Sequence, residues 1–455
     1  MTIETFNPAT GELNAVFPAF GDAEVESALA RAAEGAPEWA ARPIAERAEL
    51  MRTMAGVLRR RAGRYAELMA LEMGKPVREG RAEAEKSAWV CDYYAEEAAA
   101  MLAPRDIATD ASRSFVTFLP LGPVLAVMPW NFPFWQVLRF AAPNLMAGNV
   151  GLLKHASNVP GCAVAIEEAF IDAGFPEAAF QTFLVGSGAV AGLIEDDRVR
   201  AVTLTGSTPA GRAVAAKAGE CLKKTVLELG GSDPYVVLSD ADLDVAVEAC
   251  VTGRMINGGQ SCIAAKRWIV TAGLRDEFED RVVEAMKEKT LGDPLSEDTE
   301  VGPMARADLR DELDDQVSES VAKGARCLLG GELPDGPGAF YPPTVLTDVQ
   351  PGMPAYDDEL FGPVAAILPV ADDEEAIRVA NDTSFGLGAA VFTRDVDRGT
   401  EIAARGLEAG SCFVNAFVRS DPRLPFGGVK ASGYGRELGS LGIYEFVNVK
   451  TVWVA

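Results

Sequence analysis

Cys262 is the residue whose surroundings best suit a nucleophile. The segment INGGQSCIAAKR (256–267) places its thiol after a helical stretch and a Gly-Gly turn, where we expect the side chain to be partly exposed. A free thiol has a pKa of roughly 8.5, so it needs help from its surroundings to become a thiolate near neutral pH. The alternative is a buried structural cysteine, which is our interpretation of the other six cysteines.

Two polar side chains elsewhere could assist a nucleophile. Asn131, within MPWNFPFWQVLR (128–139), lies between an expected strand end and a helix start, and its amide could donate to a developing oxyanion. Glu228 lies at the end of an apolar strand in TVLELGG (225–231), and apolar surroundings raise the pKa of a carboxylate and suit it to general-base work. Taken alone, the asparagine could instead cap a helix, and the glutamate could be an ordinary strand-end residue.

The composition excludes several classes of function. His155 is the only histidine, so a Ser-His-Asp triad would have to use it, and a metal site with several histidine ligands is impossible. The 42 basic and 67 acidic residues give a net charge of −25, which repels phosphate backbones, so we expect no nucleic-acid partner. We expect neither a membrane span nor a signal peptide, because long apolar runs and a basic N-terminal region are missing. The seven cysteines are scattered without a C-x-x-C pair, which indicates free thiols in a reducing cytoplasm.

The apolar periodicity predicts the elements that must position these residues. Residues 22–103 carry apolar side chains at spacings of three and four, which predicts long helices. The runs SFVTFLP and PVLAVMP follow, separated by Leu121 and Gly122, and indicate a hairpin over residues 115–128. Downstream, apolar strands alternate with helical stretches: GLLK (151–154), FQTFLV (180–185), AVTLTG (201–206) and TVLELGG. This alternation predicts a parallel sheet covered by helices, and a second α/β stretch begins near Ser232.

Three loops could hold a nucleotide cofactor. VGSGAVAG (185–192) and LTGSTPAG (204–211) each join a strand to a helix, where backbone amides can face a pyrophosphate. Neither has the G-x-G-x-x-G spacing, and either could be an ordinary turn. In DDELFGPVAAI (357–367), the carboxylate of Glu359 could hold a ribose diol, and the ring of Phe361 could lie against a nicotinamide.

Seven motifs occur in a fixed order along the chain: PWNFP, LLK, TGSTPAG, LELGG, GGQSC, ELFGP and PFGGVKASGYGRE. With this ordered set the chain resembles the aldehyde dehydrogenase superfamily from about Phe6 to Val454. The resemblance implies an α/β fold with a Rossmann-like NAD(P)-binding domain, an α/β catalytic domain and a small oligomerisation hairpin. The implied boundaries are 1–112 and 123–230 for the first, 231–425 for the second, and 113–122 plus 436–455 for the third.

The same resemblance implies roles at matching positions. Cys262 matches the nucleophile that attacks the aldehyde, Asn131 the oxyanion donor, and Glu228 the base that activates water to hydrolyse a thioester. Acylating relatives lack this glutamate, so a free acid is the expected product. The implied cofactor contacts are Trp130, Asn131, Lys154, His155, Ala156, Ser157, Gly206, Ser207, Leu229, Glu359 and Phe361.

Within the superfamily the chain is most similar to bacterial succinate-semialdehyde dehydrogenases, through GQSCIAAKR and VRSDPRLPFGGVKASGYGRELG. Arg139 matches an arginine that grips the substrate carboxylate, and the C-terminal loop could add Ser420 and Arg423. The alternative is that Arg139 pairs with a structural acid. Two positions depart from the group: Ile256 replaces a second arginine, and Ala264 replaces a cysteine that forms a redox-sensitive disulfide in some relatives.

The cofactor expected from this resemblance is NADP, with NAD also possible. Many NAD-specific relatives carry a glutamate at the position of Ser157, and a glutamate would repel a 2′-phosphate. Ser157 and Lys154 could instead bind that phosphate, unless Ser157 only caps the helix starting near Pro160. The expected partners are a small carboxylate-bearing aldehyde and further copies of the chain, as a homodimer or homotetramer, with no metal.

Three other functions stay open at this point. The chain could oxidise another small or medium aldehyde, with Arg139 in a structural role. It could be a cofactor-independent thiol esterase that uses Cys262 and Glu228, or a catalytically inactive structural protein. The intact cofactor motifs argue against the esterase, and the presence of Asn131 beside the other two residues argues against the inactive protein.

Overall fold

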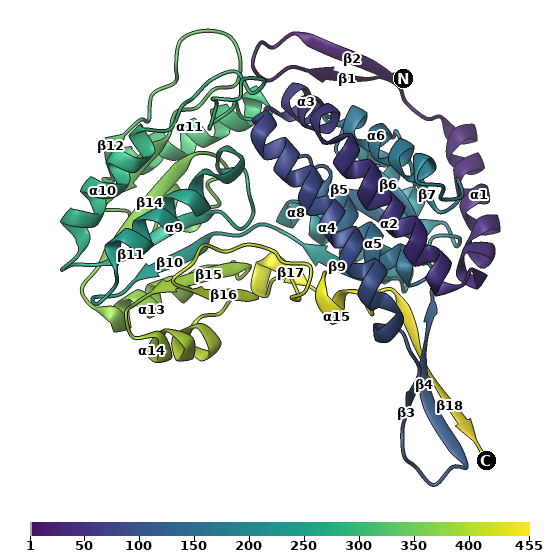
Figure 1. The fold of residues 1–455 in the computed structure, drawn as a ribbon. Coiled ribbons are helices and arrows are strands. Elements are labelled where there is room, and N and C mark those ends of the chain that lie inside the picture. The colour runs from purple at the N-terminus through teal and green to yellow at the C-terminus, as the bar shows by residue number, and fades with distance from the viewer. Residues whose placement is uncertain (1) are drawn as a thin grey trace.

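A six-stranded sheet forms the centre of the lobe built mainly from the N-terminal half of the chain (Figure 1). The computed structural model describes residues 2–455. The strands of this sheet, in spatial order, are β17 (Gly433–Tyr434), β9 (Lys224–Glu228), β8 (Ala201–Thr205), β5 (Pro123–Met128), β6 (Val150–His155) and β7 (Phe180–Thr182). The pairings are parallel except that of β17 with β9. Strands β6 and β8 are buried along their whole length, which explains why most of their residues are apolar.

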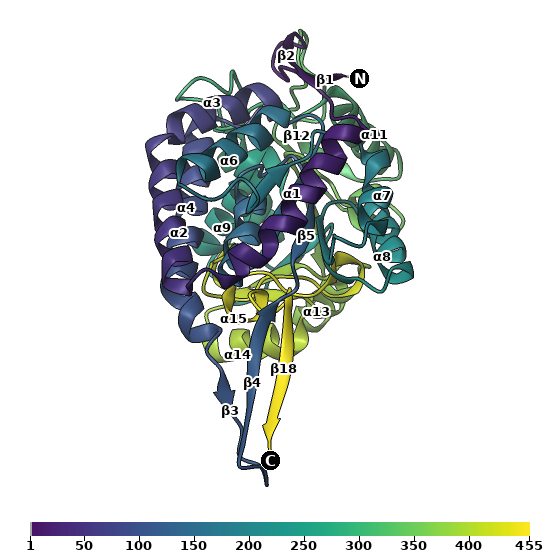
Figure 2. The same ribbon diagram turned by 90° about the vertical axis from the view of Figure 1, so that its right-hand side faces the viewer.

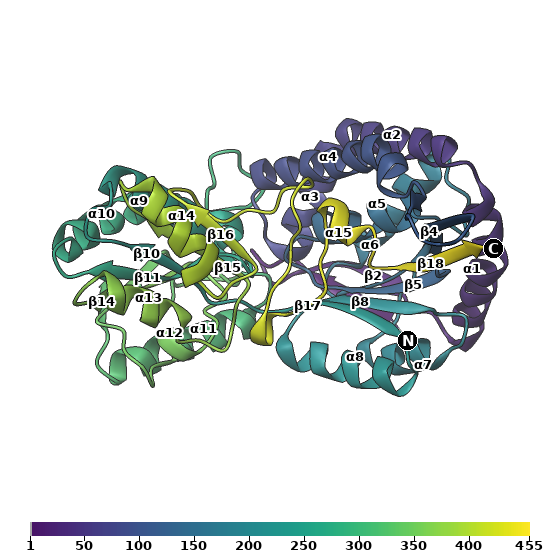
Figure 3. The ribbon, with the colours of Figure 1, turned by 90° about the horizontal axis from the view of Figure 1, so that it is seen from below.

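Helices cover both faces of this sheet. They are α1 (Asp22–Ala41), α2 (Ile44–Arg60), α3 (Ala62–Met73), α4 (Val77–Met101), α5 (Trp135–Met146), α6 (Pro160–Asp172), η1 (Ser187–Ala189), α7 (Val190–Glu195) and α8 (Thr208–Glu220). Figure 3 shows α2 and α4 on one side of the strands and α7 and α8 on the other. The first four helices occupy the stretch 22–103, so the prediction of long helices there is confirmed.

A seven-stranded sheet forms the second lobe. Its order is β12 (Arg326–Leu329), β13 (Thr344–Thr347), β14 (Val364–Val370), β11 (Ala265–Thr271), β10 (Asp233–Val237), β15 (Gly388–Phe392) and β16 (Ser411–Val414). β12 runs antiparallel to β13, and the other neighbours are parallel. Its helices are α9 (Leu243–Met255), η2 (Ile256–Gly259), α10 (Arg275–Lys287), α11 (Ala307–Ala322), α12 (Pro354–Asp357), α13 (Asp373–Asn381), α14 (Val396–Glu401) and η3 (Ile402–Gly406). Residues of α9 and α10 share one apolar core, and residues of α11 and α13 share another. The two largely parallel sheets confirm the α/β fold class.

Three antiparallel strands form an arm that extends away from the lobes (Figure 2). Their order is β18 (Val447–Val454), β4 (Arg113–Pro120) and β3 (Arg105–Asp106). The hairpin predicted over residues 115–128 is wrong, because β4 pairs with β18 and β3, whereas β5 belongs to the six-stranded sheet. The backbone N–H groups of Leu121 and Gly122 donate to Asn149 Oδ1 at 2.7 and 2.9 Å. These bonds fix the connection between β4 and β5, so that the chain continues into the six-stranded sheet and forms no hairpin turn.

The N-terminal strands reach across to the second lobe. β1 (Thr2–Phe6) and β2 (Leu13–Pro18) pair antiparallel, and between them the carbonyl of Pro8 accepts a hydrogen bond from the N–H of Ala339 at 2.7 Å. The remaining short elements, near the C-terminus, are η4 (Lys430–Ser432) and α15 (Gly439–Gly442). Across residues 2–455, every helix is too short or too polar to cross a bilayer.

Candidate active site

The loop that carries Cys262 is held in an unusual backbone conformation. It joins α9 to β11 through η2, where Asn257 has φ of 57° and Gly259 has φ of 75°. A Cβ atom on Gly259 would lie 2.2 Å from the carbonyl oxygen of Gly362, so only glycine allows this close approach. The loop that carries Cys262 therefore packs directly against the loop that carries Glu359, and Cys262 itself is half-buried.

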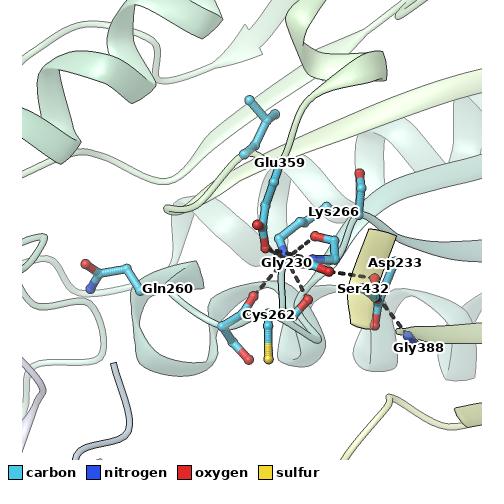
Figure 4. A network of polar contacts seen from close by, with 12 residues as sticks. Gly230, Asp233, Gln260, Cys262, Lys266, Glu359, Gly388 and Ser432 are labelled. Carbon is cyan, nitrogen blue, oxygen red and sulfur yellow. Dashed lines mark hydrogen bonds and ion pairs between the residues drawn. The ribbon is translucent and has the colours of Figure 1, made fainter. Parts of the chain in front are cut away.

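Lys266 anchors the backbone on which Cys262 sits (Figure 4). Its ammonium donates to the carbonyls of Gly231, Ser261 and Cys262 at 2.6, 2.9 and 2.7 Å. It also pairs with Glu359 Oε1 at 2.8 Å, and the lysine is 1% exposed. This role of Lys266 is not evident from the sequence, because the segment GQSCIAAKR does not show which carbonyls the lysine reaches.

The Cys262 thiol is a weak acid in this structure. Burial raises the pKa of Cys262 to about 12, although the positive charges of Lys266 and Arg139 act in the opposite direction. The residue therefore rests as a neutral thiol, and nucleophilic attack requires that its proton leave during the reaction.

Asn131 lies beside the loop that carries Cys262. Its Nδ2 donates to the carbonyl of Gln260 at 3.0 Å, and its Oδ1 accepts from Gln136 Nε2 at 3.0 Å. The side chain is 4% exposed, so these two bonds hold the amide in one orientation. The amide donor thus points at a residue two positions before Cys262 in the chain.

Glu228 is buried next to a second carboxyl group, that of Glu437. Neither carboxyl oxygen of Glu228 has a hydrogen-bond partner within residues 2–455, and the residue is 2% exposed. Burial holds its pKa well above the usual range, the charge of Glu437 raises it further, and Arg139 opposes both effects. Glu228 is thus a stronger base, once ionised, than a solvent-exposed carboxylate would be. It lies outside the wall of the cavity at Cys262, so it must turn to reach a substrate there.

A cavity of about 300 Å³ opens at Cys262. Its wall combines aromatic and aliphatic side chains with several charged ones: Lys75, Glu79, Ala82, Glu83, Lys86, Phe132, Trp135, Gln136, Arg139, Gly253, Ile256, Ser261, Cys262, Ile263, Val418, Arg419, Ser420 and Phe426. The structure thus brings Arg139 and Ser420 into one cavity with Cys262. Arg423 lies elsewhere: it bonds to Asp421 at 2.6 and 2.9 Å and is exposed.

Arg139 already has an acidic partner. Its guanidinium forms an ion pair with Glu437, donates to Thr205 Oγ1 at 3.4 Å, and lies 4.7 Å from the centre of the Phe426 ring. The structural ion pair that the sequence left open as an alternative is therefore present, although the arginine also lines the cavity. Glu437, which lies in the motif PFGGVKASGYGRE, was not recognised as this partner from the sequence.

A second cavity of about 810 Å³ lies at the carboxyl end of β6. Such edges of parallel sheets are where nucleotides bind. Trp130, Lys154, Ala156, Ser157 and Asn158 are among its lining residues. The amide Nδ2 of Asn158 is buried without a partner, and Lys154 forms no ion pair with any of residues 2–455. An unpaired donor and an unpaired cation fit a phosphate-bearing ligand.

Ser157 does not cap α6. The N-cap of that helix is Val159, and Glu72 accepts hydrogen bonds from the N–H groups of Gly161 and Cys162 at 2.8 and 2.9 Å. Because Glu72 satisfies this helix end, the alternative role proposed for Ser157 is not the one observed.

His155, Phe361 and Glu359 are further predicted cofactor residues, and each has contacts within the protein. His155 accepts from the Ala156 N–H at 2.9 Å through Nδ1, and burial lowers its pKa to about 4, so it is neutral. Phe361 meets Trp130 edge-on, with ring centres 5.7 Å apart. Glu359 is bound by Lys266.

Three backbone positions complete the set. The N–H of Gly206 donates to the carbonyl of Glu228 at 2.9 Å, and that of Leu229 to Ser432 at 3.0 Å. Ser207 is the N-cap residue of α8, and its side chain makes no capping bond. These residues lie at the ends of β8 and β9 and are absent from the wall of the 810 Å³ cavity.

Comparison with known proteins agrees with this geometry. The aldehyde dehydrogenase family model matches residues 1–452. The chain belongs to the aldehyde dehydrogenase family. It is 53% identical over 455 residues to a probable succinate-semialdehyde dehydrogenase (NADP⁺) of Synechocystis, covering 100% of both chains. It is 49% identical over 449 residues to the succinate semialdehyde dehydrogenase (NAD(P)⁺) Sad of Escherichia coli, covering 99% of this chain and 97% of the relative.

A solved structure is similar throughout. The succinic semialdehyde dehydrogenase of Streptococcus pyogenes, in complex with NADP⁺, superimposes with a TM-score of 0.97 at 37% identity, covering 99% of each chain. The family fold and the enzyme class expected from the ordered motifs are therefore confirmed.

Proposed function

We propose that this chain oxidises succinic semialdehyde to succinate with NADP⁺, through a thioester on Cys262. The observation that carries the proposal is the cavity at Cys262, whose wall holds cationic side chains in a chain of net charge −25. An anionic substrate needs such a local basic pocket against the global field. The relatives named above carry the same activity in their names, with identities of 53% and 49%.

The first step joins the substrate to the enzyme. The Cys262 thiol gives its proton to water, Lys266 and Arg139 stabilise the thiolate, and the sulfur attacks the aldehyde carbon. The carbonyl oxygen becomes an oxyanion, which accepts hydrogen bonds from the Asn131 amide and the Cys262 backbone N–H. Once hydride has left this carbon, the acyl group remains on the sulfur as a thioester.

The second step releases the acid. Glu228, in its ionised form, turns toward the thioester and takes a proton from water, whose oxygen attacks the acyl carbon and expels the Cys262 thiolate. A carboxylate with a raised pKa is a stronger base, which suits Glu228 to this step. The products are succinate and the regenerated cysteine.

The cofactor cavity suits NADP. Bound there, NADP⁺ supplies the hydride acceptor of the reaction. Ser157, Lys154 and the unpaired Nδ2 of Asn158 would hold its 2′-phosphate, and no carboxylate occupies position 157 to repel it. NAD⁺, which lacks this phosphate, remains a possible second cofactor.

One observation favours a second candidate function. Because Arg139 is already paired with Glu437, the cavity could instead serve a small uncharged aldehyde. An assay with either succinic semialdehyde or butanal as substrate separates the two candidate functions. Each substrate is tested with NADP⁺ and with NAD⁺, and the rate is measured from the absorbance of the reduced cofactor. We expect kcat/KM for succinic semialdehyde to exceed that for butanal at least tenfold. A preference for butanal would refute the proposal, and cofactor-free hydrolysis of p-nitrophenyl acetate as the main activity would point to an esterase.

We further propose that the chain divides into three parts: 1–112 with 123–230, 231–425, and 113–122 with 436–455. Strand β3 (Arg105–Asp106) moves from the first part to the third, because it pairs with β4. Strand β18 has one edge that pairs with no other strand of residues 2–455, and Val449 and Trp453 on it are exposed. Both features support assembly into a homodimer or homotetramer through this arm. Light scattering of the purified chain tests the assembly.

All seven cysteines are free thiols, which supports a cytoplasmic location.

A further inference from the structure

Lys86 lies in the wall of the cavity at Cys262. It belongs to α4, and its ammonium donates to Ser420 Oγ at 2.9 Å. The same ammonium lies 4.4 Å from the centre of the Trp135 ring on α5. Helix α4, helix α5 and the C-terminal loop thus meet at this one cation, which faces the same cavity as the nucleophile.

The charge balance of the cavity sets Lys86 apart. Lys75 pairs with Glu83, and Arg139 pairs with Glu437, so both of these cations are neutralised inside the protein. Lys86 forms no ion pair with any carboxylate of residues 2–455, although it is half-buried. A charge removed from water without a partner is costly, which makes this ammonium a strong attractor for an incoming anion.

The carboxylates near Lys86 are paired with other cations, so none of them neutralises its ammonium. Glu83 on the same helix and Asp421 on the C-terminal loop attract its charge, whereas Arg139 and Arg419 repel it. Glu83 is engaged by Lys75, and Asp421 is engaged by Arg423. Arg419 also lines the cavity, but its side chain is exposed, and solvent screens its charge.

We propose that Lys86 determines the substrate specificity of this site, with its ammonium and the Ser420 hydroxyl receiving the distal carboxylate of the aldehyde. Cys262, which lines the same cavity, then receives the aldehyde carbon, and the aromatic rings of Phe132 and Trp135 in the wall flank the carbon chain. Arg139 stays paired with Glu437 as part of the wall. This inference rests on the proposed function, because it requires a substrate that carries a carboxylate.

The protonation of Lys86 gives the proposal a pH signature. Burial, with the nearby charge of Arg139, lowers the pKa of Lys86 to about 8. Below this pH the ammonium is charged and binds a carboxylate, and above it the charge is lost. The ratio of kcat/KM for succinic semialdehyde to that for butanal should therefore fall as pH rises through 8. Using the ratio cancels the titration of Cys262 and Glu228, which affects both aldehydes equally.

The test compares wild type with Lys86→Met, Lys86→Arg and the control Lys287→Met. Lys287 lies on the exposed face of α10, so its substitution changes the net charge equally without touching the cavity. We expect Lys86→Met to raise KM for succinic semialdehyde at least tenfold and to leave KM for butanal within about twofold. Lys86→Arg should restore most of the preference, Lys287→Met should resemble wild type, and the pH dependence of the ratio should vanish in Lys86→Met.

The outcomes separate this inference from the proposed function. If Lys86→Met keeps the wild-type preference, or loses activity equally toward both aldehydes, Lys86 does not determine specificity. If wild type itself does not prefer succinic semialdehyde, the proposed function fails instead. Should Lys86→Met not fold, the pH profile of wild type still decides, because a ratio that stays constant from pH 7 to pH 9 contradicts the inference.

Discussion

The guanidinium of Arg139 and the carboxylate of Glu437 form an ion pair in the interior of the protein. The two residues are 3% and 6% exposed, and their charges act on the buried carboxyl of Glu228. The wall of the substrate cavity and the candidate general base are therefore linked electrostatically through one buried pair.

Removing one member of this pair should destabilise the protein strongly. Arg139→Ala leaves the Glu437 carboxylate buried without its partner, which lowers the free energy of unfolding by about 3–5 kcal/mol. The double variant Arg139→Met with Glu437→Met removes both charges and should recover most of that loss. Urea unfolding of both single variants and the double variant measures the effect, and strictly additive losses would contradict the pairing.

Glu437→Gln should shift the pH dependence of turnover. The negative charge of Glu437 raises the pKa of Glu228, and its removal also frees Arg139 to stabilise the ionised form of Glu228. Both effects lower the pKa of Glu228. Since the base acts when deprotonated, the limb of the kcat profile that rises with pH should move to lower pH. An unchanged or upward-shifted limb would show that Glu437 does not control this base.

Cys262→Ala should abolish turnover while NADP⁺ still binds, because no histidine or second thiol lies at this position to replace the nucleophile. Cys327→Ala is the matched control, since Cys327 is the exposed free cysteine of the second lobe. Turnover is followed by absorbance of reduced cofactor, and binding by calorimetry. Steady turnover in the Cys262 variant would refute the thioester mechanism.

Glu228→Gln should uncouple the two steps of the reaction. A glutamine cannot take a proton from water, so hydrolysis of the thioester should slow by roughly 10²- to 10⁴-fold. Rapid mixing should then reveal a burst of reduced cofactor, close to one per active site, followed by slow turnover. The absence of a burst, with a slower first turnover, would assign Glu228 to the first step.

Ser157→Glu should shift the cofactor preference toward NAD⁺. A carboxylate at this position would meet the 2′-phosphate at close range, and we expect at least a tenfold change in relative kcat/KM, about 1.4 kcal/mol. The measurement compares both cofactors in wild type and variant. A wild type that strongly prefers NAD⁺, with no change in the variant, would show that residue 157 does not contact the phosphate.

The sequence alone identified the fold class, the alternation of strands and helices after residue 150, and the candidate catalytic residues. Periodicity is a local property, so the apolar run of β6 and the helical spacing of 22–103 could be interpreted without knowing their neighbours. Cys262, Glu228 and Asn131 were found because each lies in a short motif, and the ordered motifs together indicated the family.

Only the tertiary structure decided which groups become partners. β4 looked like half of a hairpin with β5, but β18, from the far end of the chain, pairs with it instead. Lys86 carries no sequence signal, and it meets Ser420 across 334 positions of the chain. Strand pairing and charge pairing depend on which elements packing brings together, and that depends on long-range contacts that no local pattern records.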